Sequence, residues 1–163
     1  MIRNIQFGVV SLFLLFSTVA ALYEGSAILD DPWEWSYSTP FTQLLYGVVN
    51  NPSDISKLDY FVYAAKFQPA FPIIMVLSSL YLLILTGYHT FKQEKIFFAY
   101  YLSFLGGGLL LLSYFTSSSP TAGGHKMFSL FLVCGLLCIA ASLIIYFQIL
   151  KQIRMKMKAE NNS

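Results

Sequence analysis

The chain has 163 residues, of which 56% are apolar and only 11% are charged, and its net charge is +2. An ordinary soluble domain carries about 45–50% apolar and about 25% charged residues, so this composition is too poor in charge for a surface bathed in water. The charges also fall in clusters between long uncharged runs. Lipid requires each spanning segment to satisfy its own backbone hydrogen bonds, so the runs predict an all-α membrane protein.

Four runs are long enough to cross a bilayer, which takes about 20 apolar residues. We predict spans at about 5–22, 67–91, 96–115 and 127–150, forming a single four-helix membrane domain. An outer cap, 23–66, separates the first two spans, and a tail, 151–163, follows the last. The first span could instead be a cleaved signal peptide, since small residues surround Ala20. Its apolar run is longer than the about 7–15 residues usual for such peptides, which favours retention.

The distribution of basic residues predicts the orientation, because Lys and Arg accumulate on the cytoplasmic side of short loops. With both termini in the cytoplasm, Lys57, Lys66 and Lys126 lie outside, and the other seven of the ten basic residues lie inside. The opposite orientation reverses this balance. We therefore expect a multi-pass membrane protein with both termini cytoplasmic.

The outer cap begins with an Asp-Asp-Pro turn at residues 30–32. Trp33, Trp35 and Tyr37 then alternate with polar residues, and this period of two predicts an extended strand with one aromatic face. Thr39 and Pro40 have the pattern of a helix N-cap followed by proline in the first turn. The helix predicted from there covers residues 40–48 and has four apolar residues on one side: Phe41, Leu44, Leu45 and Val48.

A second cap helix is predicted from the Asn-Pro-Ser-Asp sequence at residues 51–54 to Lys66, because these residues have the pattern of a helix start. Its apolar stripe leaves the charged residues largely off it. Those residues are Asp54, Lys57, Asp59 and Lys66. We therefore expect residues 23–66 to fold as a small cap.

Small residues mark the contact surfaces expected in the third and fourth spans, because they let helix backbones approach closely in lipid. The outer turn between these spans, 117–126, is rich in Ser, Pro and Gly and is expected to be a flexible connector. The helix-packing residues predicted on this basis are Gly106, Gly107, Gly108, Cys134, Gly135, Cys138 and Ser142.

The first part of the cap is the candidate interaction surface, because it combines acids with aromatic side chains. Asp30, Asp31 and Glu34 could hold a divalent cation through carboxylate oxygens. The alternative that we favour places the aromatic rings at the membrane interface and the acids in water. The surface comprises Glu24, Asp30, Asp31, Trp33, Glu34, Trp35 and Tyr37.

Other chemistries find little support in the sequence. Cys134 and Cys138 have Cys-x-x-x-Cys spacing within a span, without loop cysteines, which favours packing over thiol redox exchange. His89 and His125 fall on opposite sides of a core about 30 Å thick, so they cannot hold one haem. No ionisable residue lies deep inside a span, which argues against a proton pump. We predict no catalytic residue, cofactor, metal or nucleic-acid partner.

The run from Ser17 to Ala27, followed by Pro32–Ser38, resembles the YjdJ-like family of small bacterial membrane proteins, a domain of unknown function. The resemblance covers roughly the first half of the chain. Because family members are shorter, it implies that the third and fourth spans are an extension. It also implies a protein of the bacterial cytoplasmic membrane, and it brings no activity or catalytic residue with it.

Two hypotheses for function remain. The first is a non-enzymatic accessory or interaction subunit, whose outer cap contacts the lipid bilayer or another membrane protein. The alternative is a membrane enzyme or carrier for a lipid-like substrate, with the acids of the cap at the mouth of the bundle. The sequence carries no indication of the oligomeric state.

Overall fold

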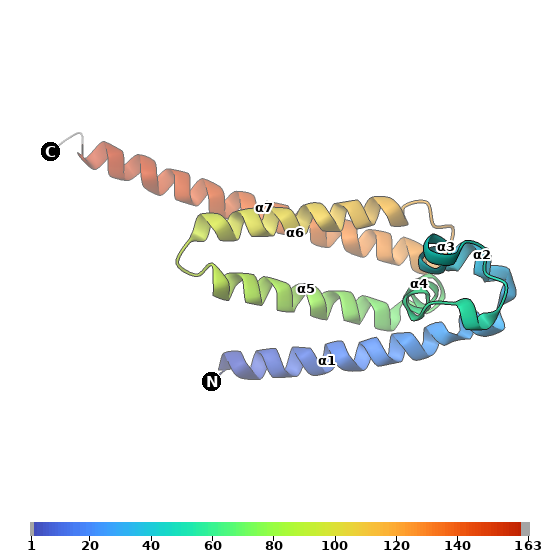
Figure 1. The fold of residues 1–163 in the computed structure, drawn as a ribbon. Helices are drawn as coiled ribbons and strands as arrows, with labels where there is room; N and C mark the ends of the chain where they lie inside the picture. The colour runs from blue at the N-terminus through green and yellow to red at the C-terminus, as the bar shows by residue number, and fades with distance from the viewer. Residues whose placement is uncertain (1, 161–163) are drawn as a thin grey trace. The chain divides into compact units, whose positions relative to one another are not determined.

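The computed structural model describes residues 2–160, and these are helical, with no β-strand among them. Figure 1 shows the seven α-helices of this part of the chain. They are α1 (Ile2–Gly25), α2 (Trp35–Ser38), α3 (Pro40–Tyr46), α4 (Lys57–Phe67), α5 (Ala70–Thr90), α6 (Lys95–Thr116) and α7 (Ala122–Glu160). Three short 3₁₀ helices, η1 (Ser26–Asp30), η2 (Pro32–Glu34) and η3 (Pro52–Asp54), lie in the cap.

Four helices, α1, α5, α6 and α7, are long and apolar enough to cross a membrane. Each contains most or all of one predicted span, so the all-helical class and the four apolar segments are confirmed. The connector predicted to be flexible is helical from Ala122 onward. Thr121 begins this helix, since its hydroxyl accepts a hydrogen bond from the Gly124 amide at 3.1 Å.

The chain divides into two compact units. Among the described residues, unit 1 holds 2–82 and 116–127, and unit 2 holds 83–115 and 128–160. Unit 1 contains the cap together with α1 and most of α5. Unit 2 contains the end of α5, nearly all of α6 and most of α7.

In unit 2, α6 packs on α7 through small residues. Gly106 is buried, and a Cβ there would lie 2.9 Å from the Gly135 carbonyl oxygen and 2.7 Å from the Ile139 side chain. Further along the pair, the Ser142 hydroxyl donates a 2.6 Å hydrogen bond to the Ala99 carbonyl oxygen. The Ser142 hydroxyl of α7 and the Ala99 carbonyl oxygen of α6 thus bond to each other instead of to water.

The other predicted packing residues lie differently. A Cβ at Gly107 or Gly108 would meet nothing within 4 Å, so of the three glycines only Gly106 lies against a neighbour within 4 Å. Successive helix residues are 100° apart, so adjacent glycines cannot share one narrow contact. The Cys138 thiol is buried, and its Cβ lies near Gly106, whereas Cys134 is partly exposed.

Gly106→Ala is expected to weaken the pairing of α6 and α7, because the new Cβ would press on a backbone carbonyl. Overpacking of this kind costs about 1–3 kcal/mol. Gly107→Ala is the matched control and should cause no loss. The measurement is the SDS fraction at which full-length protein in mild detergent loses helicity. Equal midpoints for the two variants would contradict the close contact at Gly106.

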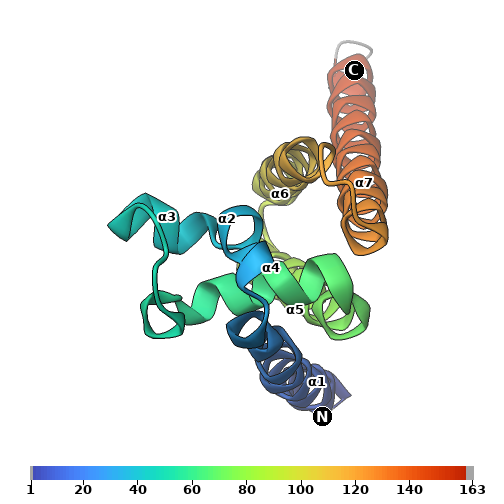
Figure 2. The same cartoon turned by 90° about the vertical axis from the view of Figure 1, so that its right-hand side faces the viewer.

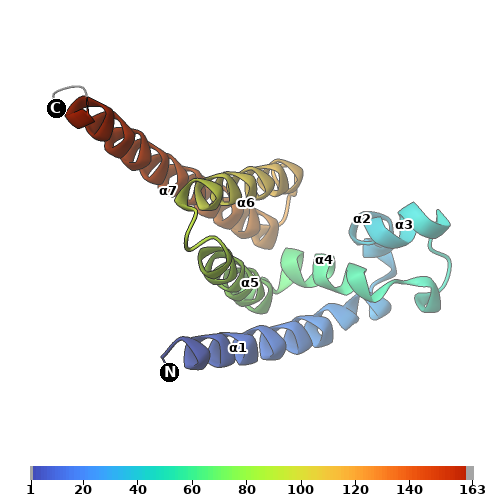
Figure 3. The same cartoon turned by 60° about the vertical axis from the view of Figure 1, so that its left-hand side comes forward.

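In unit 1, α4 lies across the C-terminal end of α1. Figure 2 looks along α1 and shows α4 running across the view. The helices touch where Gly25 meets Tyr60: a Cβ at Gly25 would lie 2.0 Å from the Tyr60 carbonyl oxygen. Figure 3 shows α4 continuing into α5 through a short turn. Alongside, Phe71 of α5 stacks edge-on against Phe16 of α1, with ring centroids 5.8 Å apart.

Candidate functional site

The predicted aromatic strand is wrong, because residues 32–38 are helical in η2 and α2. Pro32 occupies the first turn, where its fixed φ suits a helix. Trp33 and Tyr37, four residues apart, are 87% and 74% exposed. Trp35 instead turns inward, and its indole Nε1 donates to the Ile28 carbonyl oxygen at 2.8 Å. The three rings therefore do not form one row.

The cap is held together by one polar side of α4, formed by Asp59, Tyr63 and Lys66. Their spacing of four and three residues places them on one face of the helix. Each of these side chains forms a hydrogen bond with the segment before α4. We call this surface the α4 clamp.

Asp59 is fully buried and caps the start of α3. Its two carboxylate oxygens accept hydrogen bonds from the backbone amides of Phe41 and Thr42, both at 2.9 Å. The Thr42 hydroxyl donates to the same carboxylate at 2.5 Å and accepts from the Ser56 amide at 2.8 Å. A negative charge at a helix N-terminus is favourable, because it satisfies orphan amides and opposes the helix dipole.

Lys66 binds the preceding helix end. Its ammonium donates to the Tyr37 carbonyl oxygen at 2.6 Å and to the Ser38 hydroxyl at 2.9 Å, and it lies 3.8 Å from the Glu34 carboxylate. A positive charge suits the carbonyl end of α2. Burial lowers the pKa of Lys66, and the charge of Glu34 acts in the opposite direction. Asp59 and Lys66 thus clamp the two sides of the corner at Thr39.

Tyr63, between them, reaches the first turn of the cap. Its phenol donates to the Asp31 carboxylate at 3.4 Å. Burial raises the pKa of Tyr63, and the charge of Asp31 and the hydrogen bond to it raise it further. The phenol therefore stays protonated, and remains a donor, to higher pH than an exposed tyrosine.

The role of Asp59 was missed by sequence reasoning. Thr39 is the N-cap residue of α3 and Pro40 lies in its first turn, as predicted. Thr39 has no capping hydrogen bond, since its hydroxyl donates to the Trp35 carbonyl oxygen. The signal that could have pointed to the clamp is polar residues at positions i, i+4 and i+7 of an otherwise apolar helix. Asp54 and Lys57, also off the stripe, are exposed.

The acids of the candidate surface are dispersed. Asp31 accepts a hydrogen bond from Tyr63. Glu34 accepts one from Ser38 and pairs with Lys66, whereas Asp30 is exposed. One oxygen of Glu24, Oε2, is buried and has no hydrogen-bond partner among residues 2–160. In the same part of the chain, no three carboxylate, histidine or cysteine side chains come together as a metal site requires.

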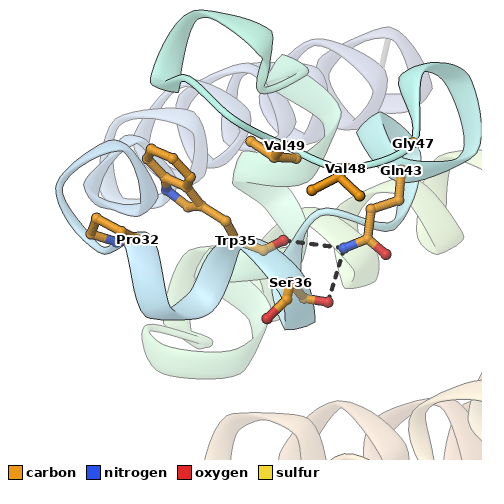
Figure 4. A pocket seen from close by; sticks show the side chains of 7 residues that line it. All are labelled: Pro32, Trp35, Ser36, Gln43, Gly47, Val48 and Val49. Carbon is orange, nitrogen blue, oxygen red and sulfur yellow. Dashed lines mark hydrogen bonds between the residues drawn. The ribbon is translucent and has the colours of Figure 1, made fainter.

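A shallow pocket of about 470 Å³ opens on the cap between α2 and the chain after α3 (Figure 4). It is mostly apolar and has no charged residue in its lining. The Gln43 amide nitrogen donates to the carbonyl oxygens of Trp35 and Ser36, at 3.2 and 2.9 Å, and closes one side. The lining residues are Pro32, Trp35, Ser36, Gln43, Gly47, Val48 and Val49. Such a lining offers no general acid or base.

The sequence profile of a family described as a domain of unknown function (DUF4306) matches residues 4–91. The chain belongs to this family. It is also similar to the uncharacterized protein YjdJ of Bacillus subtilis (strain 168), with 36% identity over 81 residues, which are 48% of this chain and 74% of the relative. The resemblance noted in the sequence is thereby confirmed. No solved structure matches the chain.

The matched stretch, residues 4–91, includes α1, the whole cap and α5. It therefore contains every residue of the α4 clamp and each hydrogen-bond partner described for it. α6 and α7 lie outside it.

Proposed function

We propose that this DUF4306 protein is a non-enzymatic accessory or interaction subunit of the bacterial cytoplasmic membrane, with four spans in one membrane domain and both termini cytoplasmic. The apolar row on α1 supports the membrane setting: Leu12, Leu15, Phe16 and Val19 are exposed, and lipid is the solvent in which they are stable. The bacterial relative supports the cytoplasmic membrane, and the distribution of Lys and Arg supports the orientation.

The observation that carries the interaction role is how the cap uses its side chains. Hydrogen bonds within the cap engage the side chains of Asp31, Glu34 and Trp35. Trp33 and Tyr37 instead project outward from the same helical segment. Exposed aromatic residues on a rigid support are typical anchors of protein interfaces. We expect a neighbouring membrane protein to bind there, with Asp30 beside the anchors.

The alternative, an enzyme or carrier with the acids at a substrate cavity, has less support. The cap pocket is lined by none of Asp30, Asp31 and Glu34. Two of these acids already have partners in the cap. The interaction role is therefore the one we retain.

Crosslinking on intact cells tests the role and the orientation together. In a Cys134→Ala/Cys138→Ala background, Trp33→Cys is treated with a membrane-impermeant thiol–amine crosslinker, and products are resolved by mass. We expect a discrete adduct with another membrane protein. Ser53→Cys, in η3, is the control for random collisions and should react without giving this adduct.

Gln152→Cys, in the tail, should stay unmodified until the cells are permeabilised. Modification of Gln152→Cys on intact cells would overturn the orientation. Reaction of Trp33→Cys without any adduct beyond the Ser53→Cys pattern would overturn the interaction role.

A further inference from the structure

We propose that α3 is an interfacial helix, whose outer apolar face rests among the lipid headgroups beside the end of α1. This face is formed by Phe41, Leu44 and Leu45. The inference rests on the proposed membrane spans, but it needs no protein partner and uses none of the residues of the candidate interaction surface.

The face is exposed and uncharged. Its three side chains are 42%, 84% and 67% exposed, and their spacing of three and four residues from Phe41 puts them on one side of the helix. No Asp, Glu, Lys or Arg occurs from Trp35 to Ser53. A contiguous apolar patch of this kind, without charges to solvate it, marks a contact surface.

Two contacts fix the position of α3 along the axis of α1. α4 is held against the outer end of α1, because only a glycine at position 25 allows the close approach of Tyr60. α3 is held to α4 by the buried Asp59 carboxylate. α3 therefore sits at a set level along α1, near the point where the apolar row of that helix ends.

The direction of the face follows from what covers the other side. Thr42 points to Asp59 on α4, and Gln43 points back to α2. The apolar face lies on the opposite side of α3 from both. In Figure 1, which shows α1 from the side, α2 lies farther toward the outer end than α3. The side of α3 opposite α2, which carries the apolar face, thus points toward the membrane-spanning part of α1.

Lipid fits this face better than a protein does. In Figure 2, α3 and α4 both run across the view while α1 is seen nearly end-on, so α3 lies parallel to the plane of a bilayer that α1 crosses. An amphipathic helix in this attitude buries its apolar side in the headgroup region. Three side chains are also a small area against the about 1,200 Å² of a stable protein interface.

The test measures depth in the membrane. Full-length protein carrying Cys134→Ala/Cys138→Ala and one new cysteine is labelled with the fluorophore NBD and reconstituted at low density into phosphatidylcholine vesicles. Leu45→Cys reports on the face, Ser53→Cys is the exposed cap control, and Leu15→Cys reports on the α1 span. Quenching is compared between lipids brominated near the headgroup and aqueous iodide.

We expect the brominated lipid to quench NBD at position 45 at least about threefold more than at position 53, with iodide showing the reverse order. Equal quenching at both positions, with strong lipid quenching at position 15, would overturn the inference alone. No lipid quenching at position 15 would overturn the membrane spans and so the proposed function. Protection of position 45 from both quenchers that increases with protein density would assign the face to a second copy and overturn the lipid contact.

Discussion

Asp59→Ala is expected to detach α3 from α4 and to unfold it locally, the largest effect we foresee for a single side chain of the cap. The change leaves the amides of Phe41 and Thr42 and the Thr42 hydroxyl without their acceptor. A buried donor left unsatisfied costs about 1–3 kcal/mol, so the total loss should reach about 3 kcal/mol. A helix of seven residues has no stability of its own to offset this loss.

Hydrogen exchange of full-length protein in detergent measures the effect. Because about 1.4 kcal/mol corresponds to a factor of ten, peptides covering α3 should lose about a hundredfold in protection. Asp59→Asn keeps one acceptor oxygen and should fall between the wild type and Asp59→Ala.

Asp30→Ala is the matched control, since Asp30 is an exposed acid of the same cap, and it should leave α3 unchanged. Peptides from α6, in unit 2, should not respond to any of the three variants. Full protection of α3 in Asp59→Ala would show that the carboxylate does not hold this helix.

Gly25→Ala is expected to separate α4 from α1. The new Cβ would lie 2.0 Å from the Tyr60 carbonyl oxygen and 2.8 Å from its Cα, and these are backbone atoms that no rotamer change can move away. Gly25 has φ of −69°, which suits any residue, so the position needs glycine for space and not for conformation. Overpacking costs about 1–3 kcal/mol, which is a rise of roughly five- to 140-fold in the open population.

The rate of trypsin cleavage after Lys57 and Lys66, which flank most of α4, measures this opening. Cleavage at these sites should accelerate in Gly25→Ala, whereas cleavage at Lys92 and Lys95, outside the cap, should not.

Gly8→Ala is the matched control on the same helix, because a Cβ at Gly8 meets nothing within 4 Å. It should be neutral, or slightly stabilising through its better helix propensity. If both variants are cleaved alike, the contact between Gly25 and Tyr60 is not what holds α4.

The long helices could be predicted from the sequence because lipid requires each spanning segment to form its own backbone hydrogen bonds, and this requirement is local. Twenty apolar residues must satisfy their own backbone, whatever lies next to them. Each predicted span therefore coincides with a long helix. The ends agree within a few residues for Ala70–Thr90 against 67–91, whereas Ala122–Glu160 continues well past the end predicted at residue 150. The helix at residues 40–48 was predicted from another local signal, the Thr-Pro pattern at its start, and it ends at Tyr46.

The cap could not be read in the same way, because its bonds join residues far apart in the chain. Thr39 has the local pattern of an N-cap, yet Asp59, about twenty residues later, supplies the carboxylate. The alternation of Trp33, Trp35 and Tyr37 over five residues was too short to separate a strand from a helical turn. Gly107 and Gly108 show the same limit: composition marks a packing helix, but only the facing helix selects which glycine is used.

One contact at the C-terminal end of α4 joins the cap to a residue outside the stretch shared with the family. Gly123, at the start of α7, lies against the carbonyl oxygens of Ala65 and Lys66, where a Cβ would come within 2.5 and 2.2 Å. Every other contact described for α4 joins it to residues inside the stretch shared with the family. The cap is thus a module that a shorter chain can inherit intact. At Gly123 the later helices meet it, where the amide end of one helix lies against the carbonyl end of another.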